Sequence, residues 1–314
     1  MNRLKVALLS GGTSSERDVS LKSGDGVFDA LDKNRYQISR FDPKYDLGKL
    51  VADAEKIDIA LIILHGPNGE DGTIQGLLDL LNVPYQGTGV LGSALAMNKT
   101  ASKQLYKHAG LMVPHFTIIN KNEAVNPKEI VGEIGLPVVI KPVKGGSSIG
   151  MSIVRDENDL LAAIQVAFQC DDTVLAEQYI SGMEVTGAVL GNQEVIPLPV
   201  VEIIPNEAYD FFNYSAKYTP GATNEICPAR LDERLTQRVQ ECARIAHKAL
   251  FCDDYSRTDM IVVGEDIYVL ETNTIPGMTP TSLLPLAAKT AGISFGQLLD
   301  RLIDLSLERS NRKR

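Results

Sequence analysis

The sequence has no hydrophobic run that approaches the ~20 residues a membrane-spanning helix requires. Its first apolar segment is soon interrupted at Gly11-Gly12, so we expect neither a membrane span nor a signal peptide. Positive charge is scarce as well, because 31 Lys and Arg against 40 Asp and Glu leave a net charge of −9. This balance argues against a nucleic-acid-binding surface and against adsorption to anionic lipid. An anionic ligand such as ATP would need a local basic cluster inside an acidic protein.

Several common site patterns are absent too. The four cysteines show neither a C-x-x-C spacing nor a zinc-ligand pattern, and reduced thiols in the cytoplasm are the expected state. The chain has no G-x-x-x-x-G-K-[ST], which excludes a Walker-type nucleotide site. One G-x-G-x-x-G match, Gly87–Gly92, has no carboxylate ~20 positions on, where a dinucleotide fingerprint requires one. We interpret this match as a tight turn into a helix.

Residues 1–95 alternate strand and helix patterns, which predicts a parallel sheet. The expected strands are Leu4–Leu9, Ile57–Leu64 and Val83–Tyr85, and the expected helices are Val19–Leu31 and Gly72–Leu81.

Two further units are expected in residues 96–184 and 185–314. For the first, the patterns predict a helix over Leu91–Ala109, strands at Phe116–Ile119, Val138–Ile140 and Val174–Tyr179, and a helix at Glu157–Phe168. For the second, they predict strands at Val185–Leu190 and Ile196–Ile203, helices at Glu233–Leu250 and Phe295–Leu307, and a frayed tail at Arg309–Arg314. An irregular loop at about 208–230 has the length typical of a lid.

The most informative segment reads as a hairpin that begins at Tyr255. If its turn is Gly264-Glu265-Asp266, then Asp259 faces Glu271 on one side of the ribbon. Opposed carboxylates repel each other, and they are the ligands that Mg2+ or Mn2+ recruits. A two-residue turn would move Asp259 out of register with Glu271, and a solvated hairpin rim is the other alternative.

The same symmetry places Arg257 opposite Asn273, on the face of the two carboxylates. Beyond the second strand, Pro276-Gly277 predicts a tight turn in which Gly277 offers an unhindered N–H. We therefore favour a metal site with an arginine beside it, a combination suited to handling phosphate.

A second phosphate candidate follows the apolar strand that ends at Lys141. The loop Lys144–Gly150, with Ser147 and Ser148 among its glycines, could wrap backbone N–H groups around phosphate oxygens. A simple hairpin turn is the alternative, but a lysine that ends an apolar strand needs a partner. Further along, Glu177 could accept a hydrogen bond from adenine N6 and Glu184 could bind ribose hydroxyls, although either alone fits a surface carboxylate.

Two loops follow strands of the expected parallel sheet. In the first, Glu16 could be an acid of the first helical turn, with Ser15 as N-cap. This position nevertheless lies at the carboxyl end of a strand, where open α/β sheets bind ligands, and an acid there suits an ammonium group. The second loop runs from His65 to Gly72, and the residues leave the role of His65 open. In the lid candidate, Lys217 could complete a phosphate cage on closure.

Six motifs in series carry a family resemblance. In chain order they are GGTSSERDVSL, HGPNGEDG, KPVKGGSSIG, EQYISGME, AKYTPGAT and SRTDM…VLETNTIPGMTPTSLLP. Together they resemble the D-alanine–D-alanine ligase family of the ATP-grasp superfamily, over essentially Leu4 to Leu307. The resemblance implies an N-terminal Rossmann-like domain (1–95), followed by an ATP-grasp fold whose subdomains are 96–184 and 185–314, of α/β and α+β class.

The resemblance also implies an activity. ATP would phosphorylate the carboxylate of one D-alanine, and the amine of a second would attack the acylphosphate, giving the dipeptide for peptidoglycan. The implied cofactors are ATP and two Mg2+ (or Mn2+) ions. The implied setting is a cytoplasmic homodimer. Other second substrates such as D-serine, a dinucleotide-dependent oxidoreductase and a non-catalytic ATP-binding module are the alternatives.

The resemblance assigns roles to residues of this chain. The catalytic set is Glu16, Ser147, Tyr218, Arg257 and Gly277. The substrate-binding set is Glu16, His65, Glu70, Ser282 and Leu283. The nucleotide set is Lys99, Lys141, Ser148, Glu177, Tyr179, Ile180, Glu184 and Lys217. The metal set is Asp259, Glu271 and Asn273.

The chain departs from the family's pattern in two places. Asn98 stands where the family often has aspartate, and a tyrosine that many relatives carry near Glu225 is absent, which leaves lid packing open. Tyr218 is present, and it favours an amine over a hydroxyl nucleophile.

Overall fold

The N-terminal strands form a parallel sheet in the computed structural model, which describes residues 3–206 and 223–313. The strand order in this part is β2-β1-β3, with β2 at Tyr36–Phe41, β1 at Leu4–Ser10 and β3 at Ile59–Ile63. The predicted parallel sheet is thus confirmed. The sequence analysis does not predict β2, whose solvent-exposed residues are polar. The predicted strand Val83–Tyr85 contributes only a single bridge, between Ala60 and Tyr85.

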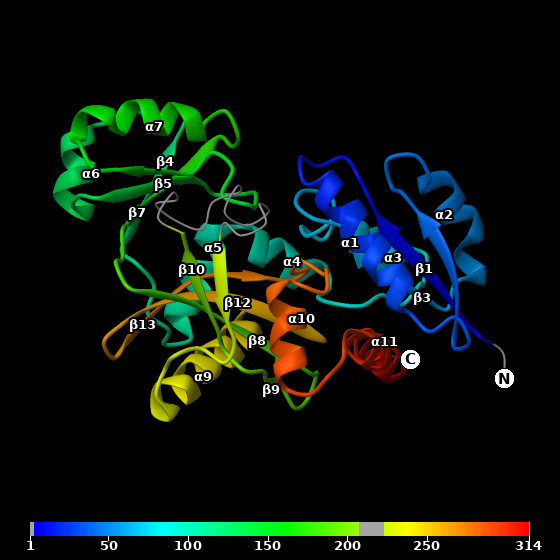
Figure 1. Ribbon diagram of the computed structural model, residues 1–314. Coiled ribbons are helices and arrows are strands. Elements are labelled where there is room, and N and C mark those ends of the chain that lie inside the picture. Colours follow the sequence, from blue (N-terminus) through cyan, green and yellow to red (C-terminus); the bar gives the residue numbers. More distant parts are fainter. Residues whose placement is uncertain (1–2, 207–222, 314) are drawn as a thin grey trace.

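Helices pack on both faces of this sheet (Figure 1). They are α1 (Arg17–Ala30), α2 (Leu47–Asp53) with the 3-10 turn Ala54–Lys56, and α3 (Thr73–Leu80). All five β3 residues are buried, as a strand covered on both faces requires.

A four-stranded antiparallel sheet lies apart from the first, at the upper left of Figure 1. Its order is β4-β7-β5-β6, from Phe116–Asn120, Thr173–Gln178, Val138–Pro142 and Ser152–Val154. The helices α6 (Pro127–Ile134) and α7 (Leu160–Ala167, preceded by the 3-10 turn Glu157–Asp159) cover one face. The predicted strands and α7 are confirmed, whereas α6 is not predicted.

The central antiparallel sheet has the order β11-β10-β8-β12-β13, and β9 also pairs with β8. Its strands are Thr223–Ile226, Val201–Pro205, Met183–Leu190, Tyr255–Val263, Asp266–Asn273 and, for β9, Ile196–Pro197. Residues of β8 alternate between two cores: Val185 and Val189 pack toward α9 (Glu233–Ala249), and Ala188 and Leu190 pack toward the C-terminal helices.

The expected helix over Leu91–Ala109 is two helices, α4 (Val90–Met97) and α5 (Lys99–His108). The helical conformation is interrupted at Asn98, which has extended backbone. Its side chain accepts a hydrogen bond from the N–H of Ala101. An asparagine caps a helix better than it continues one, so the single-helix prediction was wrong at this residue. Both helices contact β13 of the central sheet. The predicted domain boundaries at 95/96 and 184/185 stay predictions.

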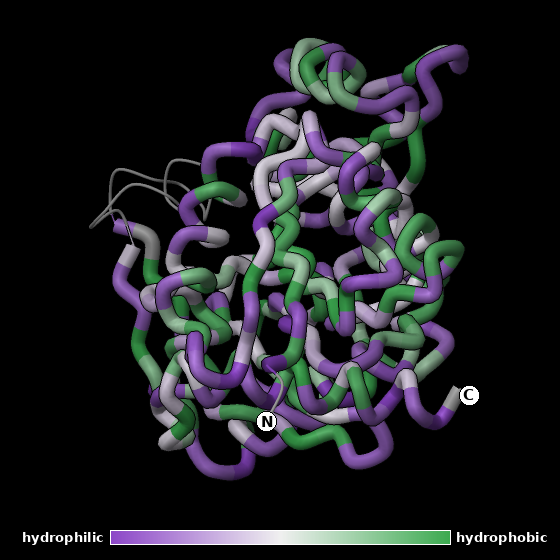
Figure 2. The backbone as a smooth tube through the Cα atoms, turned by 90° about the vertical axis from the view of Figure 1, so that its right-hand side faces the viewer, coloured by the Kyte–Doolittle hydropathy of each residue, from purple (hydrophilic) through white to green (hydrophobic). Residues whose placement is uncertain are grey.

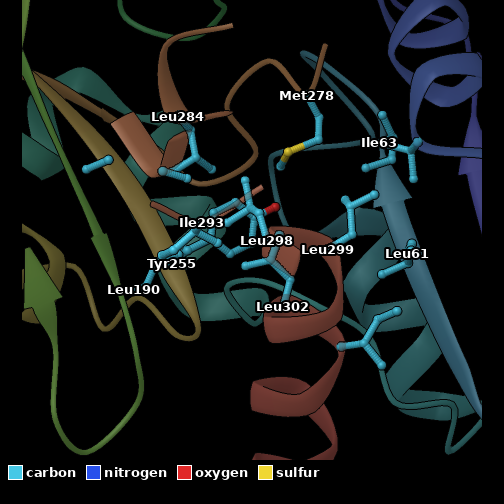
Figure 3. Close-up of a cluster of buried hydrophobic side chains, with 14 of the residues drawn as sticks. Leu61, Ile63, Leu190, Tyr255, Met278, Leu284, Ile293, Leu298, Leu299 and Leu302 are labelled. Atoms are coloured by element: carbon cyan, nitrogen blue, oxygen red, sulfur yellow. The ribbon is translucent and has the colours of Figure 1, made fainter. Parts of the chain in front are cut away.

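The C-terminal helices join the first sheet to the central one. Leu284 of α10 (Leu283–Thr290) and Leu298 and Leu302 of α11 (Phe295–Lys313) share a buried core with Leu61 and Tyr255 (Figure 3). Leu61 belongs to β3 and Tyr255 to β12, so α10 and α11 hold the two sheets in a fixed relation.

Hydrophobic stretches along the backbone are short and alternate with hydrophilic ones (Figure 2). None of the helices within residues 3–206 and 223–313 has the length and apolar content that crossing a bilayer requires.

The Gly87–Gly92 match has a packing role. A Cβ on Gly92 would lie 2.7 Å from the carbonyl oxygen of Leu250 and 2.8 Å from that of Phe251, closer than van der Waals contact allows. Gly87 has φ +88°, which favours glycine. These glycines let the segment pack against the turn between α9 and β12, as expected for a tight turn into a helix.

Asp254 is fully buried where this segment meets the end of α11. Its Oδ2 accepts hydrogen bonds from the Gly87 N–H (2.8 Å) and the Ser306 hydroxyl (2.7 Å). Arg309 lies 3.5 Å from the same oxygen and donates to the carbonyls of Tyr85 (2.7 Å) and Gly87 (2.6 Å). The frayed tail predicted from Arg309 was therefore wrong, since these acceptors hold the end of α11 in place.

Asp254 makes stability depend on pH. Burial raises the pKa of Asp254 to about 6, against the opposing effects of Arg309 and the hydrogen bonds. The pKa of this carboxyl is higher in the folded than in the unfolded chain, so its contribution to stability is fully present at a pH below its ordinary pKa and is lost as the pH rises through 6. Because of Asp254, we expect the free energy of unfolding to fall by about 3 kcal/mol between pH 4 and pH 7. Asp254→Asn should remove that loss in urea titrations across this range.

Asn tolerates the positive φ (+60°) at this position and keeps an acceptor for Gly87. Asp253→Asn is the matched control, because Asp253 is a partly exposed neighbour that also pairs with Arg309. The control should keep the pH dependence of the parent. An Asp254→Asn protein with the parent's pH dependence would contradict the assignment.

Candidate functional site

The hairpin of β12 and β13 has a two-residue turn, since Val263 pairs with Asp266. The predicted three-residue turn was wrong. The register further along is nevertheless the predicted one, with Asp259 opposite Glu271 and Arg257 opposite Asn273. A β-bulge restores it: Met260 pairs with Val269, so Leu270 is an extra residue on β13. The bulge lies next to the two carboxylates, where bulges commonly re-aim functional side chains.

Asp259 is enclosed by donors. Arg257 binds it through two parallel hydrogen bonds, Nε to Oδ1 (3.0 Å) and Nη2 to Oδ2 (2.9 Å). The Thr186 hydroxyl, on the neighbouring strand β8, donates to Oδ1 (2.7 Å), and Asn273 Nδ2 donates to Oδ2 (3.1 Å). Arg257 and Asp259 are buried. This end of the hairpin is therefore a buried, hydrogen-bonded polar cluster and not a solvated rim.

The oxygen ligands at this end of the hairpin suit a hard divalent cation that also binds a phosphate. No three His, Cys, Asp or Glu side chains gather as a metal-binding group within the described residues. The hairpin instead supplies two carboxylates, Asp259 and Glu271, and the amide of Asn273. Mg2+ is usually held by one or two carboxylates and completed by water and substrate phosphates. The residues present therefore fit Mg2+ or Mn2+ as partners of a bound nucleotide.

One pocket lies between the four-stranded sheet and the central sheet. Its walls include Asp259 and Glu271 together with most of the predicted nucleotide residues: Lys99, Lys141, Ser148, Glu177, Tyr179, Ile180 and Glu184. The nucleotide residues among them come from α5, β5, β7, the loops after β5 and β7, and the start of β8. The fold thus brings two of the three predicted metal ligands and seven predicted nucleotide residues into one pocket, whereas Asn273 adjoins it through its hydrogen bond to Asp259.

Glu177 is buried at the inner wall of this pocket, only 2% exposed, and is not a surface carboxylate. Its Oε1 accepts a hydrogen bond from Lys141 Nζ (2.6 Å), and its Oε2 forms an ion pair with Lys103 Nζ (2.5 Å). Burial opposes ionisation of Glu177, but the two ammonium groups outweigh it and hold the pKa of this carboxyl below its ordinary value. Lys141 has the partner that its place at the end of an apolar strand requires.

The loop after β5 carries a serine to the N-terminal sheet. The Ser147 hydroxyl donates to Glu16 Oε1, and both residues are buried. Ser147 (φ +52°) and Ser148 (φ +57°) hold the left-handed conformation, a strained backbone of the kind found at functional sites. Glu16 occupies the N-cap position of α1, but its side chain makes no capping hydrogen bond. The alternative with Ser15 as N-cap is wrong, because α1 begins at Arg17 and Glu16 itself takes the N-cap position.

His65 and Glu70 lie beside this pair. The Glu70 carboxylate accepts from the Gly66 N–H (2.8 Å), and His65 Nδ1 lies 4.0 Å from Glu70. Burial lowers the pKa of His65, but Glu70 and Glu16 outweigh it and raise this pKa above its ordinary value. A Cβ on Gly66 would lie 2.8 Å from Glu16 Oε2. The three titratable groups therefore form one cluster at the carboxyl edge of the first sheet.

The segment after β13 connects the hairpin to this cluster's sheet. Ile275 packs in the core on one face of the N-terminal sheet, and Met278 in the core on the other, near Ile63 (Figure 3). Ser282 then takes the N-cap position of α10 and Leu283 its first turn. A helix N-terminus suits an anionic group such as a carboxylate.

Two predicted residues, Lys217 and Tyr218, and most of the lid candidate at about 208–230 lie outside the described residues.

Three supporting residues escape sequence analysis. Lys103 and Thr186 belong to no motif. Only the tertiary structure shows that Lys103 of α5 contacts Glu177 and that Thr186, opposite Asp259 in the sheet, binds Asp259. Arg17 pairs with Asp42 and donates to the Gly12 carbonyl (2.7 Å), which fixes the loop before Glu16. The basic residue after Glu16 in the motif is the only sequence signal for any of them.

Comparisons with known proteins identify the family. The family described as D-ala D-ala ligase C-terminus matches residues 105–304, and the family described as D-ala D-ala ligase N-terminus matches residues 43–88. The chain is 62% identical to the D-alanine–D-alanine ligase of Syntrophobacter fumaroxidans over 98% of both chains. It is 52% identical to that of Desulfotalea psychrophila over 99% of this chain and 98% of the relative.

Solved structures show the same fold. The D-alanine–D-alanine ligase from Bacillus anthracis complexed with ATP has a TM-score of 0.87 at 36% identity, covering 99% of this chain and all of that one. The VanG D-Ala:D-Ser ligase from Enterococcus faecalis has a TM-score of 0.84 at 35% identity, covering 97% of this chain and all of that one.

Proposed function

The chain belongs to the D-alanine–D-alanine ligase family, and from this premise we propose that it joins two D-alanine molecules at the expense of ATP. The dipeptide would serve peptidoglycan precursor synthesis. The observation that carries the proposal is the single pocket in which two carboxylates of the hairpin meet the lysines and carboxylates predicted for a nucleotide. A similar structure is described as complexed with ATP, which supports ATP as the nucleotide.

The reaction has two chemical steps. The carboxylate of the first D-alanine attacks the γ-phosphorus of ATP, the bond to ADP breaks, and an acylphosphate forms. The amine of the second D-alanine then attacks the acyl carbon, loses a proton, and the tetrahedral intermediate expels phosphate. Mg2+ or Mn2+, which we propose as a pair held by Asp259, Glu271 and Asn273, neutralises phosphate charge when bound.

The residues on the pocket side bind and orient ATP. Lys99 and Lys141 would meet the phosphates, and the backbone of Ser148 would contact them from the strained loop. The other nucleotide residues would surround the nucleoside: Glu177, Tyr179, Ile180 and Glu184. Lys217 would add a charge from the lid.

The residues on the N-terminal side bind the amino acids. Glu16 would take the ammonium of the first D-alanine, and its hydrogen bond with Ser147 would orient the second amine together with Tyr218. The raised pKa of His65, which Glu70 and Glu16 cause, favours its charged form, and His65 would lie near the carboxylate of the first D-alanine. Ser282 and Leu283, at the N-terminus of α10, would bind the carboxylate of the second substrate.

Arg257 and the N–H of Gly277 would stabilise the oxyanion of the tetrahedral intermediate. The double hydrogen bond from Arg257 to Asp259 fixes the guanidinium before substrates bind. Donors that need no rearrangement during the reaction are the most effective ones at developing charge.

Release of ADP from ATP, measured with a panel of amino acids, tests the proposal. We expect turnover with D-alanine alone and a dipeptide product by mass spectrometry. D-serine together with D-alanine is the second candidate pair, because a structural relative is described as a D-Ala:D-Ser ligase. Faster mixed-product formation than D-alanyl-D-alanine formation would favour it. No turnover with D-alanine alone or with D-serine added, in a protein that binds ATP, would leave only a binding module.

We further propose that the enzyme works in the cytoplasm, where ATP is available, as a homodimer. Light scattering after gel filtration should then give twice the chain mass of 34.1 kDa, and the chain mass alone would contradict the dimer.

A further inference from the structure

Lys103 is the one fully buried lysine that the pocket's chemistry leaves unexplained within the described residues. It lies in the middle of α5 with none of its surface exposed. Its Nζ contacts Glu177 Oε2 at 2.5 Å, as an ion pair without the alignment of a hydrogen bond. Lys103 does not line the nucleotide pocket, whereas Glu177 and Lys141 do. It therefore touches the pocket's wall from behind.

We infer that Lys103 is a positioning residue for ATP, which holds Glu177 so that Lys141 stays available to the nucleotide's phosphates. This inference rests on the proposed use of ATP. Lys103 itself would contact neither ATP nor the reacting atoms.

The geometry divides the Glu177 carboxylate between two lysines. Oε2 faces Lys103 and Oε1 faces Lys141 at 2.6 Å. Lys141 is 8% exposed, on the pocket side. Without the Lys103 ammonium, both carboxylate oxygens would attract Lys141 alone. Its ammonium would then be drawn into a tighter pair with Glu177 and away from the pocket.

Charge points the same way. Two ammonium groups share one carboxylate, so the cluster carries a surplus positive charge in a protein whose net charge is −9. This is the local basic cluster that an acidic protein needs to bind an anion. Burial lowers the pKa of Lys103 to about 8, with Lys141 adding to the fall and Glu177 opposing it. The ammonium form still predominates at neutral pH. Removing Lys103 would leave a neutral Lys141–Glu177 pair.

A purely structural role explains the residue poorly. Burying an ammonium group is costly even when it is paired, and apolar side chains of similar volume commonly stabilise a core as well or better. The Lys103 side chain is fully buried, and its Nζ lies 6.0 Å from the centroid of the Phe116 ring, so the unbranched side chain of methionine would fit this position. A charge kept there is better explained by what it does to Glu177 and Lys141.

Lys103→Met tests the inference, and Lys107→Met is its matched control. Lys107 lies one turn further along α5 and is exposed. In Lys103→Met we expect the KM for ATP to rise roughly tenfold, with kcat and the KM for D-alanine within about threefold of the parent. The control should match the parent. A folded Lys103→Met protein with the parent's KM for ATP would overturn the inference.

A double-mutant cycle tests the inference even if the single variant Lys103→Met folds poorly. Glu177→Gln combined with Lys103→Met leaves no unpaired carboxylate in the wall. Because Lys103 acts through Glu177, the double variant should have the same affinity for ATP as Glu177→Gln alone. A further loss of about tenfold on adding Lys103→Met would show an independent role and overturn the inference.

Calorimetric titration with ATP separates this inference from the proposed function. A parent protein without D-alanine-dependent ADP release would refute the ligase proposal. The ATP affinities of the parent, the single variants and the double variant would still decide the role of Lys103.

Discussion

Replacing Arg257 with alanine is expected to lower kcat for dipeptide formation by about 10²- to 10³-fold while ATP binding is retained. The guanidinium is buried, and its double hydrogen bond to Asp259 holds it in one orientation. A donor fixed in this way stabilises the oxyanion of the transition state more strongly than it stabilises the bound substrates in the ground state. The loss should therefore appear in kcat, measured as ADP release at saturating substrates, and not in the affinity for ATP.

Arg257→Lys separates charge from geometry. Lysine keeps the positive charge but lacks the planar fork that pairs with a carboxylate, so kcat should fall between the parent and Arg257→Ala. Asp259 keeps its hydrogen bonds from Thr186 and Asn273 in either variant, which limits the structural damage. Equal kcat in Arg257→Ala and the parent would remove Arg257 from the catalytic set.

Replacing Glu271 with glutamine should lower activity by about a hundredfold or more and raise the Mg2+ concentration needed for half-maximal activity. Glu271 is one of two carboxylates that face each other across the hairpin. If it were only a charge near the pocket, its neutralisation would favour an anionic nucleotide and tighten ATP binding. The metal assignment predicts the opposite result, because the cations that join ATP to the protein are held less well.

Glu265→Gln is the control for this experiment. Glu265 lies in the turn of the same hairpin, is exposed, and pairs with Arg234 and Arg238. The substitution changes the net charge by the same amount, so its activity and Mg2+ dependence should equal those of the parent. Tighter ATP binding by Glu271→Gln with unchanged Mg2+ dependence would contradict the metal site. A chelator should abolish the parent's activity, and added Mg2+ should restore it.

The hairpin shows how far a sequence pattern reaches. Alternation fixes which residues share a face within each strand, because side chains repeat every two residues. Whether Asp259 and Glu271 share a face depends on the turn length and on any bulge between the strands. Their pairing depends on the turn, and the predicted three-residue turn was wrong. The bulge at Leu270 restores the predicted pairs, and no residue type there announces it, since bulges accept many side chains. The right partners were thus predicted from the wrong turn.

Other differences have local causes. Asn98 fits the helical pattern around it, yet its capping hydrogen bond ends one helix and starts the next. Arg309 is polar and near the end of the chain, which suggests fraying, but its acceptors come from Tyr85 and Gly87, far away in sequence. Local patterns carry no information about such distant partners.

The candidate site shows the same contrast between residues that local sequence marks and residues that only distant partners reveal. Motif residues such as Lys141, Ser147 and Glu177 stand at strand ends or in glycine-rich loops, where local sequence marks them. Lys103 stands in an ordinary helix, and nothing in α5 distinguishes it from Lys107. Only the tertiary fold, in which α5 packs against β13 and α9, brings its ammonium to Glu177 of β7. Residues that act through other residues are the part of a site that a sequence conceals best.

The core shared by the first strand and the last helix has a consequence for synthesis on the ribosome. Val6 and Leu8 of β1 are buried together with Leu298 and Leu302 of α11. The ribosome releases β1 and α1 long before α11, so the part of this face that α11 covers stays exposed while the residues between them are synthesised. An exposed apolar face on a nascent chain invites aggregation. The synthesis of α11 therefore limits when the N-terminal sheet is protected from self-association.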